Sequence, residues 1–211
     1  MRRVFSIFAI LFFSFSIAFG QFGKLGKLGG DNLRKLAKKK IVINKQPSNI
    51  DEFRQMRDSL AKSAEGGAAM FLLALKIYTE NQDLGRKCLV LTVTRSHLST
   101  GNDYKGYSVS HADMVWIDNQ LGKDNSIPRA YIKGASPDNN YQVSLPYVYK
   151  FYTNKYSGNR SSGVIKLFVQ CYGADSDRPI TMVKNNRGLW KADNWSSIII
   201  GVKHPAPDDD L

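Results

Sequence analysis

The first half of the chain has the apolar spacing of helices. Apolar residues recur every three to four positions over 50–60, as on one face of a helix, and Asp51 follows Ser48 at the distance of a capping box. Residues 68–78 are apolar on two faces, which is typical of a buried helix. Residues 84–98 combine a helical stripe with a β-rich centre, and we favour a helix there. We expect helices over 50–60, 68–78, 84–98 and, capped by Ser110, over 110–121.

The second half alternates apolar and polar residues, which is the period of strands. The alternation is clearest over 147–153 and 164–172, and clusters of Gly, Asn, Asp and Ser separate the runs. We expect strands over 129–133, 147–153, 164–172, 180–184, 189–191 and 197–202. Helices followed by strands indicate an α+β fold, in which N-terminal helices pack on one face of a C-terminal antiparallel sheet.

The N-terminus has the three parts of a secretory signal peptide. Arg2 and Arg3 precede an uncharged, mostly apolar run over 4–19, and Ala18 and Gly20 place small residues before a cleavage point. We expect export, to the periplasm or the extracellular space, after cleavage near Gly20. An uncleaved anchor helix is the alternative, although the apolar run is shorter than the ~20 residues that span a bilayer.

Positive charge is concentrated directly after this signal. The chain carries a net charge of +12; residues 21–45 hold eight Lys or Arg and one acid, whereas residues 46–211 hold twenty against seventeen. We expect a basic flexible linker over 21–45, a single domain over 46–205 and an acidic disordered tail over 206–211. The nearly balanced domain argues against a nucleic-acid partner. The basic residues over 24–40 are either solvated or attracted to an anionic membrane surface.

Two long motifs resemble an uncharacterised family of bacterial secreted domains of unknown function. Residues 127–141 read IPRAYIKGASPDNNY, similar to the PRSYxxGATPENxY of that family, and residues 173–181 read GADSDRPIT, similar to its GADSxRPIT. Ala130, Ser136 and Asp138 stand where the family has Ser, Thr and Glu. The resemblance covers roughly residues 50–205 and implies a fold and a family, without an activity.

The same motifs bring charged residues together along the sequence. Arg129 and Arg178 each adjoin a proline near an expected strand start, and the acids of the two motifs are Asp138, Asp175 and Asp177. Because a guanidinium fork binds carboxylates and other anions, a shared anion-binding corner is one hypothesis. The hypothesis we favour is an ion pair that holds two loops together.

The remaining chemistry of the sequence is sparse. His97, His111 and His204 lie in different segments, without the close spacing of zinc ligands. The serine motif GxSxG does not occur. We therefore expect no metal site and no cofactor. Cys88 and Cys171 are the only cysteines, and in an exported chain they suit either a disulfide or two packed thiols.

Three hypotheses for the function follow. We favour an exported, non-catalytic domain that binds a partner protein or an envelope polymer. The second hypothesis is a hydrolase-like enzyme with His97 or His111 as its general base. The third is attachment to an anionic surface through the basic segment, which would then carry most of the function.

Overall fold

The structure, a computed structural model, describes residues 38–205. The predicted signal peptide over 1–20, the first part of the predicted linker (21–37) and the predicted tail over 206–211 lie outside the described residues. Within them, no helix combines the length and the apolar character needed to cross a bilayer.

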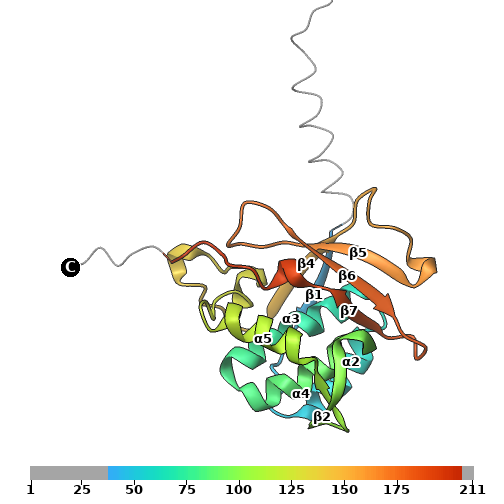
Figure 1. The fold of residues 1–211 in the computed structure, drawn as a ribbon. Helices are drawn as coiled ribbons and strands as arrows, with labels where there is room; N and C mark the ends of the chain where they lie inside the picture. The colour runs from blue at the N-terminus through green and yellow to red at the C-terminus, as the bar shows by residue number, and fades with distance from the viewer. Residues whose placement is uncertain (1–37, 206–211) are drawn as a thin grey trace, which may run out of the picture.

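A five-stranded antiparallel sheet forms one layer of the molecule (Figure 1). Its order is β1 (Lys39–Ile43), β4 (Tyr147–Tyr152), β5 (Val164–Val169), β6 (Arg178–Lys184) and β7 (Trp190–Asn194). Strands β4 to β7 form a meander, and β1 pairs with β4 at the far edge. Alternate side chains are buried beneath the sheet: Ile41, Ile43, Tyr149, Phe151, Ile165, Leu167, Ile180, Met182 and Ala192. The helices lie on that side in Figure 1, which confirms the predicted α+β fold.

Helix α3 (Ala64–Glu80) is the central element and contacts both the sheet and the other helices. Fifteen of its seventeen residues are buried, as the two-sided apolar pattern predicts. The helix begins four residues earlier than expected. The pair Gly66 and Gly67 suggested a break in the helix, but both residues lie in its first turn. A Cβ at Gly66 would stand 1.8 Å from Leu60 O, and one at Gly67 2.4 Å from Trp190 O. Glycine therefore permits close packing here.

Three further helices surround α3: α2 (Ile50–Leu60), α4 (Gln82–Thr92) and α5 (His111–Leu121). The cap of α2 is Asn49, one residue after the predicted Ser48, because the Asn49 side chain accepts hydrogen bonds from Asp51 N and Glu52 N. Ser110 caps α5 and Gly122 ends it, as predicted.

The predicted helix over 84–98 is wrong in its last six residues. Helix α4 ends at Thr92; Val93 then forms a bridge with Ala192, and Thr94 N donates to Ala192 O at 2.9 Å. The free edge of β7 takes these residues as partners because its backbone groups need hydrogen bonds. A short 3-10 helix η1 (Arg95–His97) and the hairpin β2 (Leu98–Tyr104) to β3 (Tyr107–Val109) follow, and the sequence reading missed this hairpin.

Two predicted strands are also wrong. Residues 129–133 and 197–202 contain the 3-10 turns η2 (Arg129–Tyr131) and η5 (Ser196–Ile198), and η3 (Pro137–Asn139) and η4 (Arg160–Ser162) are further turns. Apolar runs of this length do not distinguish a strand from a buried turn. Tyr131 OH donates to Ile198 O at 2.6 Å, so the two turns pack against each other.

Strand β1 corrects the predicted linker. Residues 39–43 pair with β4 over five positions, with Ile41 and Ile43 buried, and are therefore part of the folded domain. The run of lysines suggested a solvated segment. The alternation of exposed and buried side chains that marks a strand extends over only five residues here, so it is easily missed.

Candidate functional site

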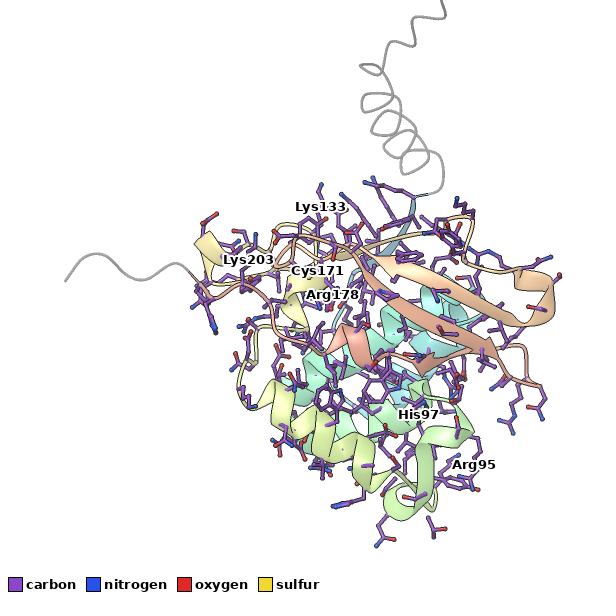
Figure 2. All side chains as sticks on the ribbon, turned by 45° about the horizontal axis from the view of Figure 1, so that its top comes forward. Arg95, His97, Lys133, Cys171, Arg178 and Lys203 are labelled. Carbon is purple, nitrogen blue, oxygen red and sulfur yellow. The ribbon has the colours of Figure 1, made fainter. Side chains whose placement is uncertain are left out.

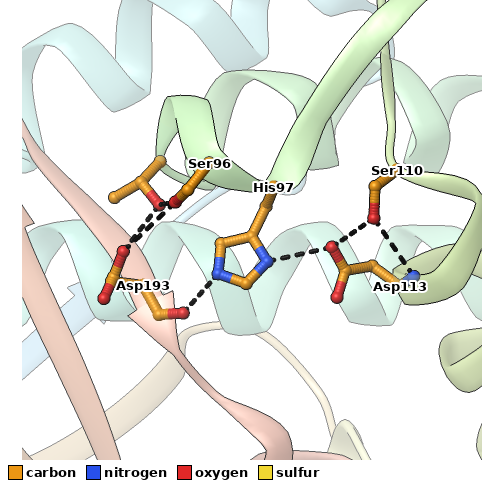
Figure 3. Close-up of polar contacts among 6 residues, drawn as sticks. Ser96, His97, Ser110, Asp113 and Asp193 are labelled. Carbon is orange, nitrogen blue, oxygen red and sulfur yellow. Dashed lines mark hydrogen bonds and ion pairs between the residues drawn. The ribbon is translucent and has the colours of Figure 1, made fainter.

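His97 stands where three segments meet: η1, which carries it, the start of α5 and the end of β7 (Figure 3). Its Nδ1 lies 2.9 Å from Asp113 Oδ2, and its Nε2 forms a hydrogen bond with the backbone carbonyl oxygen of Asp193. Ser110 Oγ donates to the same Asp113 oxygen at 2.6 Å. The residue that caps α5 therefore also orients the carboxylate that faces the histidine.

The two partners of His97 determine what its ring can do. A backbone carbonyl only accepts hydrogen bonds, and so does an ionised carboxylate. Both bonds are complete only when both ring nitrogens carry protons, and that imidazolium has no lone pair for a general base. In a Ser-His-Asp triad the Nε2 atom faces the nucleophile; here it faces a carbonyl. The arrangement joins segments rather than preparing a proton transfer.

The side chain of Asp193 is held by Thr94 and Ser96, which precede His97 in the chain. Its Oδ1 accepts hydrogen bonds from Thr94 Oγ1 at 2.8 Å and from Ser96 Oγ at 3.4 Å, and the two hydroxyls lie 2.7 Å apart. Among the described residues, no hydrogen bond reaches its Oδ2. A carboxylate held on one oxygen and open on the other is available as an acceptor for a ligand.

Two tryptophans complete a surface hollow of ≈ 300 Å³ beside His97. The hollow is lined by His97, Asp113, Trp116, Asp193, Asn194, Trp195 and Ser196. Trp116, on α5, is 38% exposed. Trp195 is buried, with its ring 5.5 Å from that of His97. Its Nε1 atom is itself buried and has no hydrogen-bond partner among the described residues, so the ring lines the hollow without presenting this donor to it. We call these seven residues the tryptophan hollow.

A second hollow of ≈ 510 Å³ adjoins the first, with Ser96 and Asp193 in both linings. Its other charged residues are Arg95 and Lys191, and Val93, Leu98 and Val183 form an apolar part. We call it the basic hollow. The pKa of Lys191 falls to about 8, because the amine is removed from water and because Arg57 is near. The two hollows meet at Ser96 and Asp193, near the end of β7, and we refer to them together as the groove.

The largest cleft, of ≈ 720 Å³, lies elsewhere, between the ends of α3 and α5 and the chain near His204. Three of its polar side chains are joined to one another, whereas Asp124 Oδ2 is buried without a hydrogen-bond partner among the described residues. Tyr78 OH donates to Asp118 Oδ1, and Arg86 reaches both Tyr78 OH at 3.2 Å and Asp118 Oδ2 at 3.8 Å. Burial and the bond to Asp118 raise the pKa of Tyr78 to about 12. Because this network is internally paired, size alone does not make the cleft the better site.

The residues of the predicted anion-binding corner are not joined by ion pairs. Arg178 donates to the backbone carbonyls of Ser197, at 3.5 Å, and Gly201, at 3.1 Å, and Arg129 donates to Asn125 Oδ1 at 3.4 Å. Asp175 pairs with Lys203. Within residues 38–205, neither Asp138 nor Asp177 forms an ion pair with either arginine. Arg178 therefore fastens the C-terminal segment to β6 through carbonyls, near Cys171 and Lys203 (Figure 2).

The other sequence candidates are dispersed. Cys88 and Cys171 are both buried and both free, so the structure has two packed thiols and no bond between them. His111 is exposed at the first position of α5, and His204 lies at the largest cleft. Within the described residues, no three His, Cys, Asp or Glu side chains group as a metal site would require.

The sequence reading identified His97 and missed the rest of the groove. Trp116 lies next to Val115 on α5, and both are exposed although large and apolar. Exposed apolar residues can mark a binding surface, but the sequence shows this only after the buried and exposed faces of the helix have been assigned. Trp195 and Asp193 come near His97 only because β7 lies beside η1, which requires the pairing of Val93 with Ala192.

Comparison with known proteins gives a family and nothing further. No curated protein and no solved structure matches the chain. Residues 45–206 match a family described as a domain of unknown function, DUF6935. Since that match covers most of the chain, the protein belongs to the DUF6935 family.

Proposed function

We propose that this protein is an exported, non-catalytic domain that binds a saccharide polymer of the cell envelope through the groove beside His97. The observation that carries the proposal is the tryptophan hollow. It combines the partly exposed ring of Trp116 with a carboxylate oxygen of Asp193 that no hydrogen bond reaches among the described residues. A partner protein, the other occupant that the sequence suggests, has no comparable feature in its favour.

The chemistry of the hollow suits a sugar ring. A sugar has apolar C–H faces that pack on an aromatic ring, and its hydroxyls both donate and accept hydrogen bonds. Trp116 offers the ring, and Asp193 Oδ2 offers an acceptor. A pocket with apolar walls and a few convergent polar groups is the usual form of a small-ligand site.

The extent of the groove favours a polymer over a single sugar. The tryptophan hollow of ≈ 300 Å³ and the basic hollow of ≈ 510 Å³ lie on either side of the residues they share, Ser96 and Asp193. A ligand in both would bridge Asp193, whose position is fixed by Thr94 and Ser96. Rigid placement of the central acceptor reduces the entropy lost on binding.

The hydrolase hypothesis has weaker support. A general base needs an unprotonated nitrogen directed at its substrate; the His97 nitrogens face Asp113 and a carbonyl. His111 has no acid within hydrogen-bond distance among the described residues. Export itself rests on the N-terminal sequence pattern, and fractionation that finds the intact chain in the cytoplasm would contradict it.

Titration calorimetry of the mature chain with soluble tetrasaccharides tests the proposal. We expect at least one of chitotetraose, cellotetraose and tetragalacturonate to bind with a dissociation constant of ~10 μM to 1 mM. Trp116→Ala removes the ring and should weaken that binding at least tenfold, which corresponds to ~1.4 kcal/mol.

The matched control is Tyr156→Ala, which removes another exposed aromatic ring, 71% exposed and outside the groove. It should leave the dissociation constant unchanged. Absence of binding by all three sugars, or equal binding by folded Trp116→Ala, would overturn the proposal.

A further inference from the structure

We infer that the saccharide this groove accepts is acidic, with an anionic group of the chain held in the basic hollow by Arg95 and Lys191. The inference rests on the proposed function and names the ligand class of the same site. Its basis is a difference in charge between the two parts of one groove.

The two cations of the basic hollow lack acidic partners. Within residues 38–205 neither Arg95 nor Lys191 forms an ion pair. In the tryptophan hollow, by contrast, the carboxylate of Asp113 lies 2.9 Å from His97. The basic hollow holds these two cations against one carboxylate, that of Asp193, which both hollows share.

Each cation is held in place by neighbours that leave donors free. The Arg95 guanidinium lies over the Tyr107 ring, with 4.1 Å to its centroid, which restricts its rotation. Among the described residues, none accepts a hydrogen bond from its N–H edge. Lys191 Nζ donates to Leu91 O near the end of α4, which uses one of its three protons. Arg95 is exposed and Lys191 is half-buried, so one is accessible and the other is already partly desolvated.

The surroundings of Lys191 strengthen the case. Arg57 and Arg187 lie near enough to lower its pKa, and Asp58, the acid near it, already pairs with Arg57 at 3.0 Å. An anion bound here would relieve repulsion among like charges. A carboxylate suits the planar fork of Arg95, and a sulfate or phosphate ester presents the same charge to it.

The test compares one sugar chain with and without charge. Tetragalacturonate and its methyl ester have the same rings, and only the acid carries carboxylates. We expect the acid to bind the mature chain at least tenfold more tightly than the ester at low salt. The preference should shrink as salt rises, because the contact is a partly exposed ion pair. A sulfated tetrasaccharide of chondroitin, against its unsulfated form, distinguishes ester anions from carboxylates.

Arg95→Gln should reduce the preference for the acid over the ester to about twofold. Lys133→Gln is the control of equal charge, since Lys133 is exposed and lies far from Arg95 (Figure 2); it should retain the preference. Lys191→Gln is the second variant, and its effect should match the direction of Arg95→Gln.

The outcomes separate the two claims. If acid and ester bind equally, or if Arg95→Gln and Lys133→Gln reduce the preference alike, the inference is wrong and the saccharide site stands. If the sugars do not bind at all, the proposed function fails and the inference fails with it.

Discussion

At the scale of single residues, His97 shows how one side chain can fix a site without taking part in chemistry. Its two hydrogen bonds connect η1 to α5 and to β7, and these three segments line the tryptophan hollow together with Trp195 and the first residue of η5, Ser196. Its ring also packs against Trp195 at 5.5 Å. The histidine therefore determines where the indole and the open oxygen of Asp193 stand.

Replacement of this histidine should destabilise the fold. We expect His97→Ala to lower the free energy of unfolding by about 2–3 kcal/mol, because it removes a charge-assisted bond and leaves a carbonyl unpaired. His111→Ala, at the exposed start of α5, should change it by less than about 0.5 kcal/mol. Denaturation in urea measures both, and equal effects would contradict the role assigned to His97.

The two buried thiols predict a loss of stability at high pH. Burial raises the pKa of Cys88 to about 12 and also raises the pKa of Cys171. Both thiols stay neutral in the folded protein at pH values where the unfolded chain ionises, from about pH 9 upward. The unfolded state then binds fewer protons, so the free energy of unfolding falls as pH rises above 9.

Cys88→Ala should remove part of that slope between pH 9 and 11, while the slope below pH 9 stays as in the wild type. Unfolding curves in urea at a series of pH values provide the measurement. A variant with the full wild-type slope would show that Cys88 ionises freely in the folded state.

At the scale of elements, the attachment of β1 depends on one buried acid. Glu65, in the first turn of α3, is 2% exposed; Arg160 of η4 binds both of its oxygens, and Lys39 of β1 reaches it at 3.4 Å. Burial, the largest single influence, would raise the pKa of Glu65. The hydrogen bonds from Arg160 and from the backbone amide of Glu65, together with the charges of Arg160 and Lys39, outweigh it, and the pKa is lowered. The stabilisation is therefore present above the ordinary pKa of glutamate and is lost as pH falls.

Glu65→Gln should cost about 3 kcal/mol of unfolding free energy, because it leaves the guanidinium of Arg160 without its charge partner. The exposed pair of Asp83 with Lys87 is the control, and Asp83→Asn should change stability by less than about 0.5 kcal/mol. Hydrogen exchange should also show faster exchange of the β1 amides in Glu65→Gln. Unchanged protection of β1 would contradict this account.

The sequence predicts elements well where one pattern decides and poorly where tertiary packing decides. Helix α5 follows from Ser110, Gly122 and its spacing alone. The early start of α3 follows from a close approach to Trp190 that Gly67 permits, which a local pattern cannot reveal. The hairpin after α4 and the groove beside it depend on the contact of Val93 with β7. Because the sequence does not reveal this contact, His97 is the only groove residue that the sequence analysis identified as a candidate.

At the scale of the whole molecule, the central helix and the sheet position a groove at the edge of β7. The sheet ends there, and residues 93–97 cover its edge. The residues that line the groove come from segments almost one hundred positions apart, such as Thr94 and Asp193. The predicted corner around Arg178 lies at another end of the molecule (Figure 2) and holds the C-terminal segment to the sheet.

The indole N–H signals of the three tryptophans in a nitrogen–proton correlation spectrum test the saccharide site most directly. Trp116 and Trp195 line the hollow, whereas Trp190 is buried and lies outside both linings. On titration with a binding tetrasaccharide, we predict that the signals of Trp116 and Trp195 move and that the signal of Trp190 stays in place. Saturation with all three signals unmoved, or with Trp190 alone displaced, would contradict the groove as the binding site.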